Sequence, residues 1–580
     1  MTDRRFWLST AAIWAGTCLL LVVIAWSAIV AWRFPDPDDQ MRLLEVRDWL
    51  AGQSWFDVTQ HRINLPAGLP IHWSRLVDLP IAAVILTLRP LLGQLLAEHV
   101  ALVVVPLLTL GVVMALVAAL ARRLFANDAQ ALMAVSITPV CAEVLHQLQP
   151  MRIDHHGWQM AMALLTTYAI IGAPTRRSGY LAGLAITVWV TISLEGLPMI
   201  AAILALVALK WAVTPSNRPL LVATMATSCA GAGLLFLVSH PPSAWGVSMC
   251  DAVSPVYLAM LAIAAFGSIG VAMLPIRTTA GRLAALACVG AAALVPLPLM
   301  APQCAAGPFG QLDPLVRHFW YLKVAEGLPL WVQDVPSIIN TIGLPVIGLA
   351  GTVLAVRTSQ GEERARWIAM LFLLCAATIL TTLVQRAAGV ANLLAIAGAV
   401  RLLHPLLLRA RSIENLPKRL AATLAVFVAA APGAVSGIAI TSAAPDARVT
   451  AVRRAMGCLA ASDMKALSVL PRGNVLAPLD ISPTILLLTH HDAVASGYHR
   501  GATAMHDVIA TFTGTADQAH ALVIRRRVDY VAFCPGLPEV LIYENEAPKG
   551  FLAQLDAGRT PAWLTPVALH GSPAKVWRVR

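Results

Sequence analysis

Long apolar runs, separated by short polar gaps, fill most of the first 440 residues. About 13 of these runs approach or exceed the roughly 20 residues that a helix needs to cross a bilayer core. They are 7–32, 99–121, 128–148, 158–173, 179–194, 197–213, 220–238, 255–274, 283–300, 338–356, 367–384, 389–404 and 420–440. The pattern predicts a polytopic α-helical membrane protein with about 13 transmembrane helices.

One further apolar stretch, 78–93, is interrupted by Arg89 and Pro90. Counting it as a span would place basic gaps on both sides of the membrane, against the positive-inside rule. We therefore expect an interfacial or re-entrant helix on the outer face.

Composition and charge placement favour the same class of protein. Hydrophobic residues make up 58% of the chain and charged residues only 13%, whereas soluble domains carry about 25% charged residues. The net charge of +11 comes largely from arginines in short gaps, which indicates cytoplasmic loops and not a nucleic-acid partner. These gaps contain Arg4-Arg5, Arg122-Arg123, Arg176-Arg177, Arg218, Arg277 with Arg282, Arg364 with Arg366, and the arginines of 409–419.

This charge pattern also predicts an orientation. The N-terminus is expected in the cytoplasm, and an odd number of spans places the C-terminal part outside, in the periplasm of a bacterium with the spans in its inner membrane. The run 7–32 lacks a small-residue cleavage site, so we expect a retained signal-anchor.

The polar segments predict two outer loops, 33–98 and 301–337, and a separate C-terminal domain. Residues 1–440 are expected to form the transmembrane domain and 441–580 a periplasmic α/β domain. In the first loop, the 3.6-residue pattern of Gln40 to Gly52 predicts an amphipathic helix in the interface plane. In the C-terminal domain we expect strands at 474–478, 484–489, 530–534 and 575–579, and helices at 448–461, 502–512 and 515–525.

Two acidic clusters lie at the ends of apolar runs on the predicted outer face. The first is Asp36-Pro37-Asp38-Asp39-Gln40-Met41-Arg42, and the second is Arg152-Ile153-Asp154-His155-His156. Ionisable groups beside the membrane are costly and are usually retained for function. Carboxylates suit Mg²⁺, and a nearby imidazole favours Mn²⁺, so the clusters predict metal-assisted chemistry on a lipid-linked substrate.

Structural alternatives exist for several of these residues. Asp38 or Asp39 can cap the helix that begins near Gln40, whereas Asp36 lies early for a cap. His155 is better explained as a polar residue at a helix start, and Glu195 fits a site or a helix end equally well. For Asp154 we favour the functional role.

Other polar residues were weighed in the same way. The pairs Cys250 with Cys304 and Cys458 with Cys534 can each form a disulfide if their side of the membrane is oxidising. Tyr498-His499-Arg500 and His490-His491 can face the site, but surface or capping roles are favoured.

Four short motifs occur in a specific order along the chain. Asp36-Pro37 is followed by Arg42, then by Asp154-His155-His156, by Val324-Ala325-Glu326-Gly327-Leu328-Pro329 and by Gln385-Arg386. In this order and sidedness the chain resembles the GT-C superfamily of polyprenyl-phosphate-dependent glycosyltransferases, and within it the catalytic subunit of oligosaccharyltransferases. The Asp-His-His form of the second motif resembles archaeal members.

The resemblance implies a fold and a set of roles. It implies a GT-C-like helical domain, a polyprenyl-(pyro)phosphate-linked sugar donor, an extracytoplasmic acceptor and a divalent Mn²⁺ or Mg²⁺ ion. The implied metal ligands are Asp36, Asp154 and His156. The implied catalytic residues are Asp36, Asp154 and Glu326. The substrate-binding set is Arg42, Arg386, Asp38 and Asp39, with Arg386 on the donor phosphate.

The chain also departs from that subunit. The acceptor-recognition signature Trp-Trp-Asp-Tyr-Gly is absent from the sequence. Transfer to a glycan, a lipid or a protein therefore stays open, with oligosaccharyltransferase-type protein glycosylation as one alternative. A flippase for lipid-linked glycans is a second class, but transport sites usually lie at the midplane between repeated halves, and the acids lie at span ends. A non-catalytic assembly protein is a third class.

Overall fold

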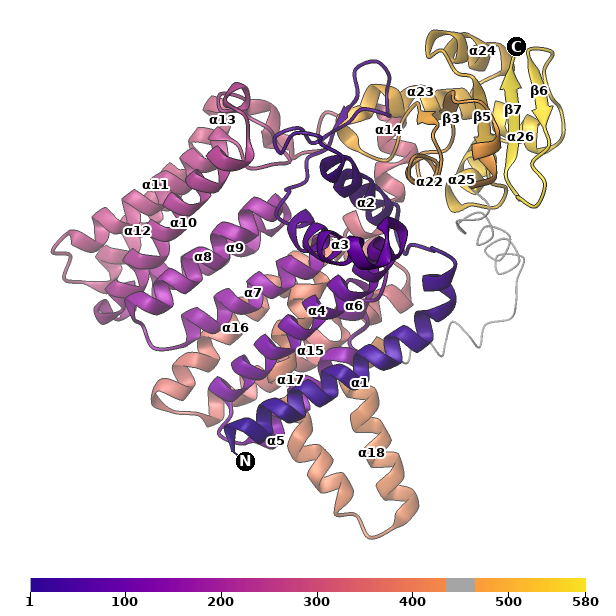
Figure 1. Cartoon of the computed structure of the whole chain (residues 1–580). Coiled ribbons are helices and arrows are strands. Elements are labelled where there is room, and N and C mark those ends of the chain that lie inside the picture. Colours follow the sequence, from indigo (N-terminus) through magenta and orange to yellow (C-terminus); the bar gives the residue numbers. More distant parts are fainter. Residues whose placement is uncertain (1, 434–464) are drawn as a thin grey trace.

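The computed structural model describes residues 2–433 and 465–580, most of which are helical (Figure 1). Nine of the described helices are long and apolar enough to cross a membrane. They are α1 (Asp3–Val30), α4 (Gln94–Leu124), α9 (Leu197–Val213, extended to Leu194 by a 3₁₀ turn), α10 (Arg218–Ser239, extended to Pro215 by a 3₁₀ turn), α11 (Pro255–Met273), α12 (Thr279–Leu294, continued to Met300 by a short helix), α15 (Val335–Thr358), α16 (Gly361–Leu383) and α17 (Ala388–Arg411, extended to Gln385 by a 3₁₀ turn). The predicted polytopic helical architecture is therefore confirmed.

Other predicted spans are shorter. α7 (His156–Ile171) and α8 (Arg176–Ile192) have 16 and 17 residues. α18 (Leu416–Ala430) covers the first part of the run 420–440, and the last residues of that run lie outside the described ranges. The number of spans therefore stays a prediction.

The run 128–148 is not one helix. It is divided into α5 (Asp128–Ile137), the 3₁₀ turn η1 (Thr138–Val140) and α6 (Ala142–His146). Pro139 explains the break, because proline has no amide hydrogen and disfavours the α conformation in the residue before it.

Close packing of α15 on α17 forms the centre of the helix bundle. A Cβ on Gly351 of α15 would collide with the Gly398 carbonyl oxygen of α17, and a Cβ on Gly398 would collide with the Gly348 carbonyl oxygen of α15. Small residues permit this approach, as at helix crossings in membranes. α17 is buried along most of its first half, so the turn before it, η9 (Gln385–Ala387), has a rigid support.

The first outer loop contains α2 (Pro37–Leu50), α3 (Asp78–Leu92) and an antiparallel hairpin of β1 (Thr59–Gln60) and β2 (Leu69–Pro70). α3 has 15 residues, too few for a full span. It ends at Gly93, whose φ of +77° favours glycine, and the chain turns there directly into α4.

α2 differs from the predicted interfacial helix. It begins at Pro37, a favoured first helical residue, and Asp36 is its N-cap: the Asp36 carboxylate accepts a hydrogen bond from the Asp38 amide at 2.9 Å. Its polar residues Gln40 and Glu45 are also buried, because α3 and a helix of the C-terminal domain pack against it. α2 is thus a buried structural helix.

The late outer loop consists of short elements. They are α13 (Pro296–Met300), η5 (Pro302–Ala306), α14 (Pro314–Phe319), η6 (Tyr321–Lys323), η7 (Ala325–Gly327) and η8 (Leu330–Val332). Cys304 of η5 is bonded to Cys250, a pairing that the sequence left open. Cys458 lies outside the described residues, so its pairing with Cys534 stays a prediction.

The C-terminal domain has a five-stranded mixed sheet with the strand order β4-β3-β5-β7-β6. Its strands are β3 (Asn474–Leu476), β4 (Asp492–Ala493), β5 (Tyr530–Phe533), β6 (Leu564–Val567) and β7 (Lys575–Val579). β3 is parallel to β4 and β5, whereas β7 is antiparallel to β5 and β6. Its helices are η10 (Ala466–Val469), α22 (Ser482–Leu488), η11 (His499–Gly501), α23 (Ala502–Thr513), α24 (Ala516–Arg525), α25 (Pro538–Glu546) and α26 (Phe551–Asp556).

One predicted strand of this domain is wrong. The run 484–489 is helical in α22, where Pro483 occupies the first turn and the apolar side chains are buried on all sides. A short apolar run buried all round has no periodicity that separates helix from strand. The predicted helix 448–461 and the domain boundary at 440 lie outside the described residues.

The C-terminal domain and the N-terminus lie at opposite ends of the helix bundle (Figure 1). The domain packs on the first outer loop: α22 contacts α2, and the Arg62 guanidinium donates to the Leu486 and Thr489 carbonyl oxygens, at 2.8 Å each. The N-terminal end of the bundle holds Arg122, which pairs with Asp3 at 2.7 Å. The basic gaps and the C-terminal domain are thus separated by the length of the bundle.

Candidate functional site

The two acidic clusters meet at the end of the bundle nearest the C-terminal domain. Asp39 of α2 accepts hydrogen bonds at one oxygen from the amides of Ile153 (2.8 Å) and Asp154 (3.1 Å). Its other oxygen lies 3.1 Å from the Arg152 guanidinium. A carboxylate near the start of α2 therefore fixes the backbone of the second cluster.

Arg152 links the two clusters, although the sequence analysis gave it no role. Its guanidinium lies 3.5 Å from Asp36 and 3.5 Å from Asp154, in addition to its contact with Asp39. The sequence did contain a possible signal for Arg152. Acids that are buried together require a cation, and Arg152 belongs to the second acidic cluster.

Asp154 pairs with both histidines that follow it. Each imidazole Nδ1 lies 2.5 Å from one carboxylate oxygen, and the rings of His155 and His156 stack at 4.4 Å. Burial opposes ionisation, but the imidazoles outweigh it and hold the pKa of Asp154 well below its ordinary value. Burial likewise opposes the charge on His155, yet Asp154 and Glu195 raise the pKa of His155 to about 9.

Glu195, Glu326 and Arg386 extend this cluster. Glu195 lies on the 3₁₀ turn η2 (Leu194–Gly196), 3.2 Å from His155 Nε2 and 3.6 Å from His156 Nε2. Arg386 of η9 pairs with Glu195 and, at 2.7 Å, with Glu326 of η7. The sequence left Glu195 open between a site residue and a helix end; it is part of this network.

Each of these three residues sits on a one-turn 3₁₀ helix at the end of a long helix or within the late loop. The backbone amide of Gln385 donates to the Leu328 carbonyl oxygen at 3.2 Å, so η7 and η9 are held together. Burial would raise the pKa of Glu326, but Arg386 outweighs it and lowers that pKa. Glu326 is therefore an ionised partner of the arginine at neutral pH.

Two predicted substrate-binding residues, Arg42 and Asp39, are buried. Arg42 is fully buried, lies 2.8 Å from Asp78, and stacks over the Trp73 ring at 4.4 Å. Its guanidinium also lies 3.7 Å from Asp154. Asp39 is fully buried as well and binds backbone amides. Arg42 contacts the Asp154 carboxylate and Asp39 binds the Asp154 amide, and their contact with a substrate stays a prediction.

The C-terminal domain contributes Tyr498. Its hydroxyl donates to Asp38 at 2.9 Å, and the residue is only 5% exposed. Burial, Asp36 and Asp154 raise the pKa of Asp38 well above its ordinary value. The favoured surface role is therefore wrong for Tyr498, but His490 and His491 do bind backbone carbonyl oxygens of their own domain.

The donor atoms of Asp154, His155 and His156 all lie within 4.8 Å of one another, as metal ligands require. His156 Nε2 is buried and has no hydrogen-bond partner, so this nitrogen is available as a ligand. Asp36 does not belong to this compact group, although Arg152 places it beside the group. The residues present fit a divalent cation, with His155 as a ligand that the sequence did not favour.

Exposure divides the site into two parts. We name Asp39, Arg42, Arg152 and Asp154 the buried base, since each side chain is at most 2% exposed. We name Asp36, Glu195, Glu326 and Arg386 the open rim, with side chains 23–36% exposed. The side chains of the rim, unlike those of the base, are therefore accessible to a ligand.

Comparison with solved structures identifies the architecture. The chain is similar to the archaeal oligosaccharyltransferase AglB from Archaeoglobus fulgidus in complex with an inhibitory peptide and a dolichol-phosphate, with a TM-score of 0.68 and 15% identity over 92% of this chain and 70% of that chain. The apo form of the Archaeoglobus fulgidus enzyme matches with a TM-score of 0.63 and 15% identity, over 90% and 69% of the two chains.

The complex of an Archaeoglobus fulgidus oligosaccharyltransferase with Zn and sulfate matches with a TM-score of 0.60 and 14% identity, over 90% and 68%. No protein-family model matches the sequence, and no curated protein matches it significantly. At this identity the likeness concerns the fold. The chain therefore shares the fold of these archaeal oligosaccharyltransferases.

Proposed function

We propose that the protein is a membrane glycosyltransferase of the GT-C type. It transfers a sugar from a polyprenyl-phosphate or polyprenyl-pyrophosphate donor to an acceptor outside the cytoplasm, in a bacterial inner membrane. The observation that carries the proposal is the continuous polar network from Asp36 through Arg152, Asp154 and His156 to Glu195, Arg386 and Glu326.

The open rim binds the reactants in this proposal. Arg386 is a partly exposed cation that can pair with a donor phosphate, as arginine commonly does. Asp36 and Glu326 are the exposed carboxylates that can orient an acceptor hydroxyl and take its proton. Their different positions, on α2 and on η7, suit contact with the acceptor from two sides.

The buried base supports this chemistry without touching the reactants. Arg152 and Asp39 fix the backbone at Asp154, and Arg42 balances its charge. Asp154 and His156, with His155 or Asp36, would hold Mn²⁺ or Mg²⁺. A bound cation would stabilise the negative charge that develops on the leaving phosphate.

The acceptor is the open part of the proposal. The neighbour AglB was solved with an inhibitory peptide and a dolichol-phosphate, which favours a lipid-phosphate donor and permits a peptide acceptor. The missing Trp-Trp-Asp-Tyr-Gly signature argues against the same peptide recognition. We therefore propose a glycan or lipid hydroxyl first, and protein glycosylation as the second candidate.

The proposed function can be tested in cells that lack the protein. Glycolipids and surface glycans of a deletion strain are profiled after complementation with wild type, Asp154→Asn or Glu362→Gln. Glu362 is a matched acidic control, because it is 92% exposed and lies far from the site in α16. The proposal predicts one missing sugar in the deletion and Asp154→Asn strains only. Identical profiles in all strains would contradict it.

A further inference from the structure

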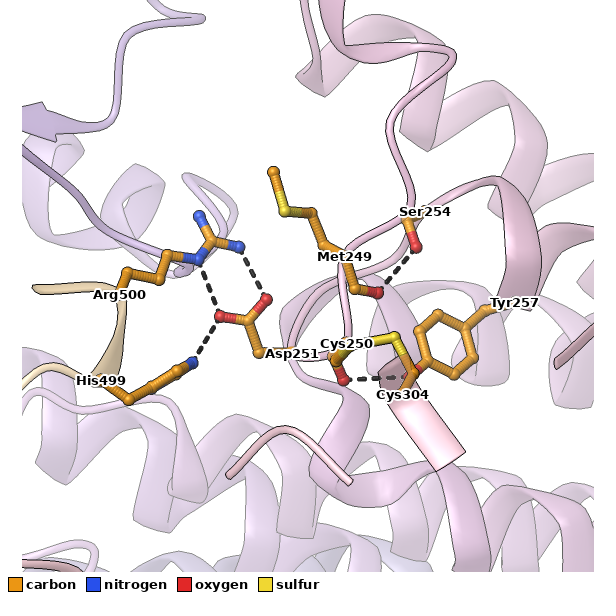
Figure 2. Close-up of a disulfide and its surroundings, with 8 residues drawn as sticks. All are labelled: Met249, Cys250, Asp251, Ser254, Tyr257, Cys304, His499 and Arg500. Carbon is orange, nitrogen blue, oxygen red and sulfur yellow. Dashed lines mark hydrogen bonds and ion pairs between the residues drawn. A yellow bond between two sulfur atoms is a disulfide. The ribbon is translucent and has the colours of Figure 1, made fainter. Parts of the chain in front are cut away.

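The loop between α10 and α11 makes a polar contact with the C-terminal domain that the proposed function does not use. Asp251 of this loop accepts hydrogen bonds from Arg500 at both oxygens, at 2.7 and 2.8 Å, and one oxygen lies 2.7 Å from His499 Nε2 (Figure 2). The Asp251 side chain is only 9% exposed. Such a bidentate, largely buried pair is directional and stronger than a surface ion pair.

His72, Asp251 and His499 also have metal-type donor atoms within 4.8 Å of one another. However, the Arg500 guanidinium already neutralises the Asp251 carboxylate and would repel a cation at the same oxygens. The arrangement is therefore better suited to hold two parts of the chain together than to bind a metal.

Several contacts fix Asp251 from behind. Cys250, its neighbour, is bonded to Cys304 of η5 (Figure 2). The Tyr257 hydroxyl donates to the Cys250 carbonyl oxygen, and the Ser254 hydroxyl donates to the Met249 carbonyl oxygen, each at 2.9 Å. The loop is thus attached to α11 and to the late outer loop, and Asp251 has a defined place.

The partners of Asp251 lie in the segment 496–501, beside Tyr498. The amide of Gly501 donates to the Tyr498 carbonyl oxygen at 2.8 Å, and Gly501 packs on Leu69 of β2. The Tyr498 ring meets Trp73 edge to face at 5.3 Å, and its hydroxyl donates to Asp38. A rigid path of contacts therefore leads from the disulfide through Asp251 to a carboxylate next to the rim.

We propose that Asp251 and Tyr498 are positioning residues for transfer: Asp251 holds the segment 496–501, and Tyr498 thereby fixes the Asp38 carboxylate beside Asp36. The inference rests on the proposed function. It means that the C-terminal domain completes the site through Tyr498, in addition to packing on the first outer loop. It also makes the Cys250–Cys304 disulfide a requirement for full activity.

The first test measures the segment itself by amide hydrogen exchange of purified full-length protein. In Asp251→Asn, and in the double variant Cys250→Ser with Cys304→Ser, the amides of 496–501 should exchange faster than in wild type. Glu546→Ala is the matched control. Glu546 joins the same domain to the late loop through Lys323 and His318, but it does not contact the segment 496–501. Exchange at 496–501 that is unchanged in Asp251→Asn would overturn the inference.

The second test measures transfer kinetics of Tyr498→Phe, Asp251→Asn and their combination. Each single variant should lower kcat roughly tenfold, as expected for the loss of one buried hydrogen bond. The donor KM should stay near the wild-type value. The double variant should be little worse than either single variant, because both act through Asp38.

Glu546→Ala is the control in the kinetic test. It should keep the wild-type kcat, and its combination with Tyr498→Phe should have the kcat of Tyr498→Phe alone. Fully additive losses in the Tyr498→Phe, Asp251→Asn double variant, or a wild-type kcat in either single variant, would overturn the positioning role. A wild-type protein without transfer activity would instead contradict the proposed function, and the exchange test would still decide whether Asp251 holds the segment.

Discussion

The buried base and the open rim contain the same kinds of side chain, acids and arginines, but the structure uses them differently. In the base, Asp39 and Arg152 are bound on several sides by backbone amides and opposite charges. In the rim, Arg386 binds two carboxylates and remains partly exposed. A charge enclosed by the protein orients its neighbours, whereas a charge at the surface of the site can exchange its partner for a substrate.

The largest effect is expected at Asp154, where base and proposed metal site meet. Asp154→Asn should lower transfer by on the order of 10²–10⁴-fold, since it removes the charge that orients both imidazoles. Asp154→Ala should also unfold more easily, because breaking a buried charge network costs about 3–5 kcal/mol. Transfer assays and thermal unfolding of the detergent-purified variants measure the two effects.

Removal of the cation should have the next largest effect. Dialysis against EDTA is expected to abolish transfer, and Mn²⁺ or Mg²⁺ should restore it, because Asp154 and His156 offer the ligands. Binding of Mn²⁺ can be followed independently by electron paramagnetic resonance. Equal Mn²⁺ binding by wild type and His156→Ala would contradict the assignment of this residue.

Arg386 tests the rim alone. Arg386→Ala should raise the donor KM by roughly 10–100-fold while the unfolding temperature changes little, because the side chain is partly exposed. Arg386→Lys should restore only part of the affinity, since a single ammonium cannot replace a bidentate guanidinium. A large loss of stability with an unchanged donor KM would contradict this prediction and would give Arg386 the structural role of the base residues.

Substitution of Asp39 tests the base, and we expect the reverse of the Arg386→Ala result: a loss of stability with little change in the donor KM. Asp39→Ala should lower the free energy of unfolding by about 2–4 kcal/mol, because two backbone amides and Arg152 lose their acceptor. The donor KM of the folded fraction should change far less than in Arg386→Ala. Chemical denaturation measures the first quantity, and kinetics at low temperature the second.

The smallest effect is expected outside both regions. Glu362 and Arg366 form an exposed pair 3.4 Å apart on α16. Glu362→Gln should change stability by no more than about 0.5 kcal/mol and leave transfer unchanged. A loss of transfer in this variant would show that the assay reports general damage and not the site.

The sequence predicted the helical class and singled out five residues of the network. Asp36, Asp154, His156, Glu326 and Arg386 could be found because each lies in a short motif at the end of an apolar run or in the loop between two runs. The long apolar runs likewise predicted spans without any tertiary information, since hydropathy identifies helices that cross a membrane.

What the sequence left open or predicted wrongly has physical causes. Arg152 and Glu195 depend on which helix ends meet in space, and one sequence does not contain that information. Arg42 and Asp39 have the residue types of substrate ligands, but their burial is set by α22 and α3 packing on α2. The helix α22 was mistaken for a strand because a run buried on every side shows no period.

Sugar transfer in vitro tests the central claim most directly. Purified wild-type protein with Mn²⁺, a labelled polyprenyl-phosphate sugar and an extract of the cell's own glycans and lipids is compared with Asp154→Asn and Glu362→Gln. The account predicts label on an acceptor with wild type and Glu362→Gln, and none above background with Asp154→Asn. Equal transfer by Asp154→Asn and wild type would contradict it.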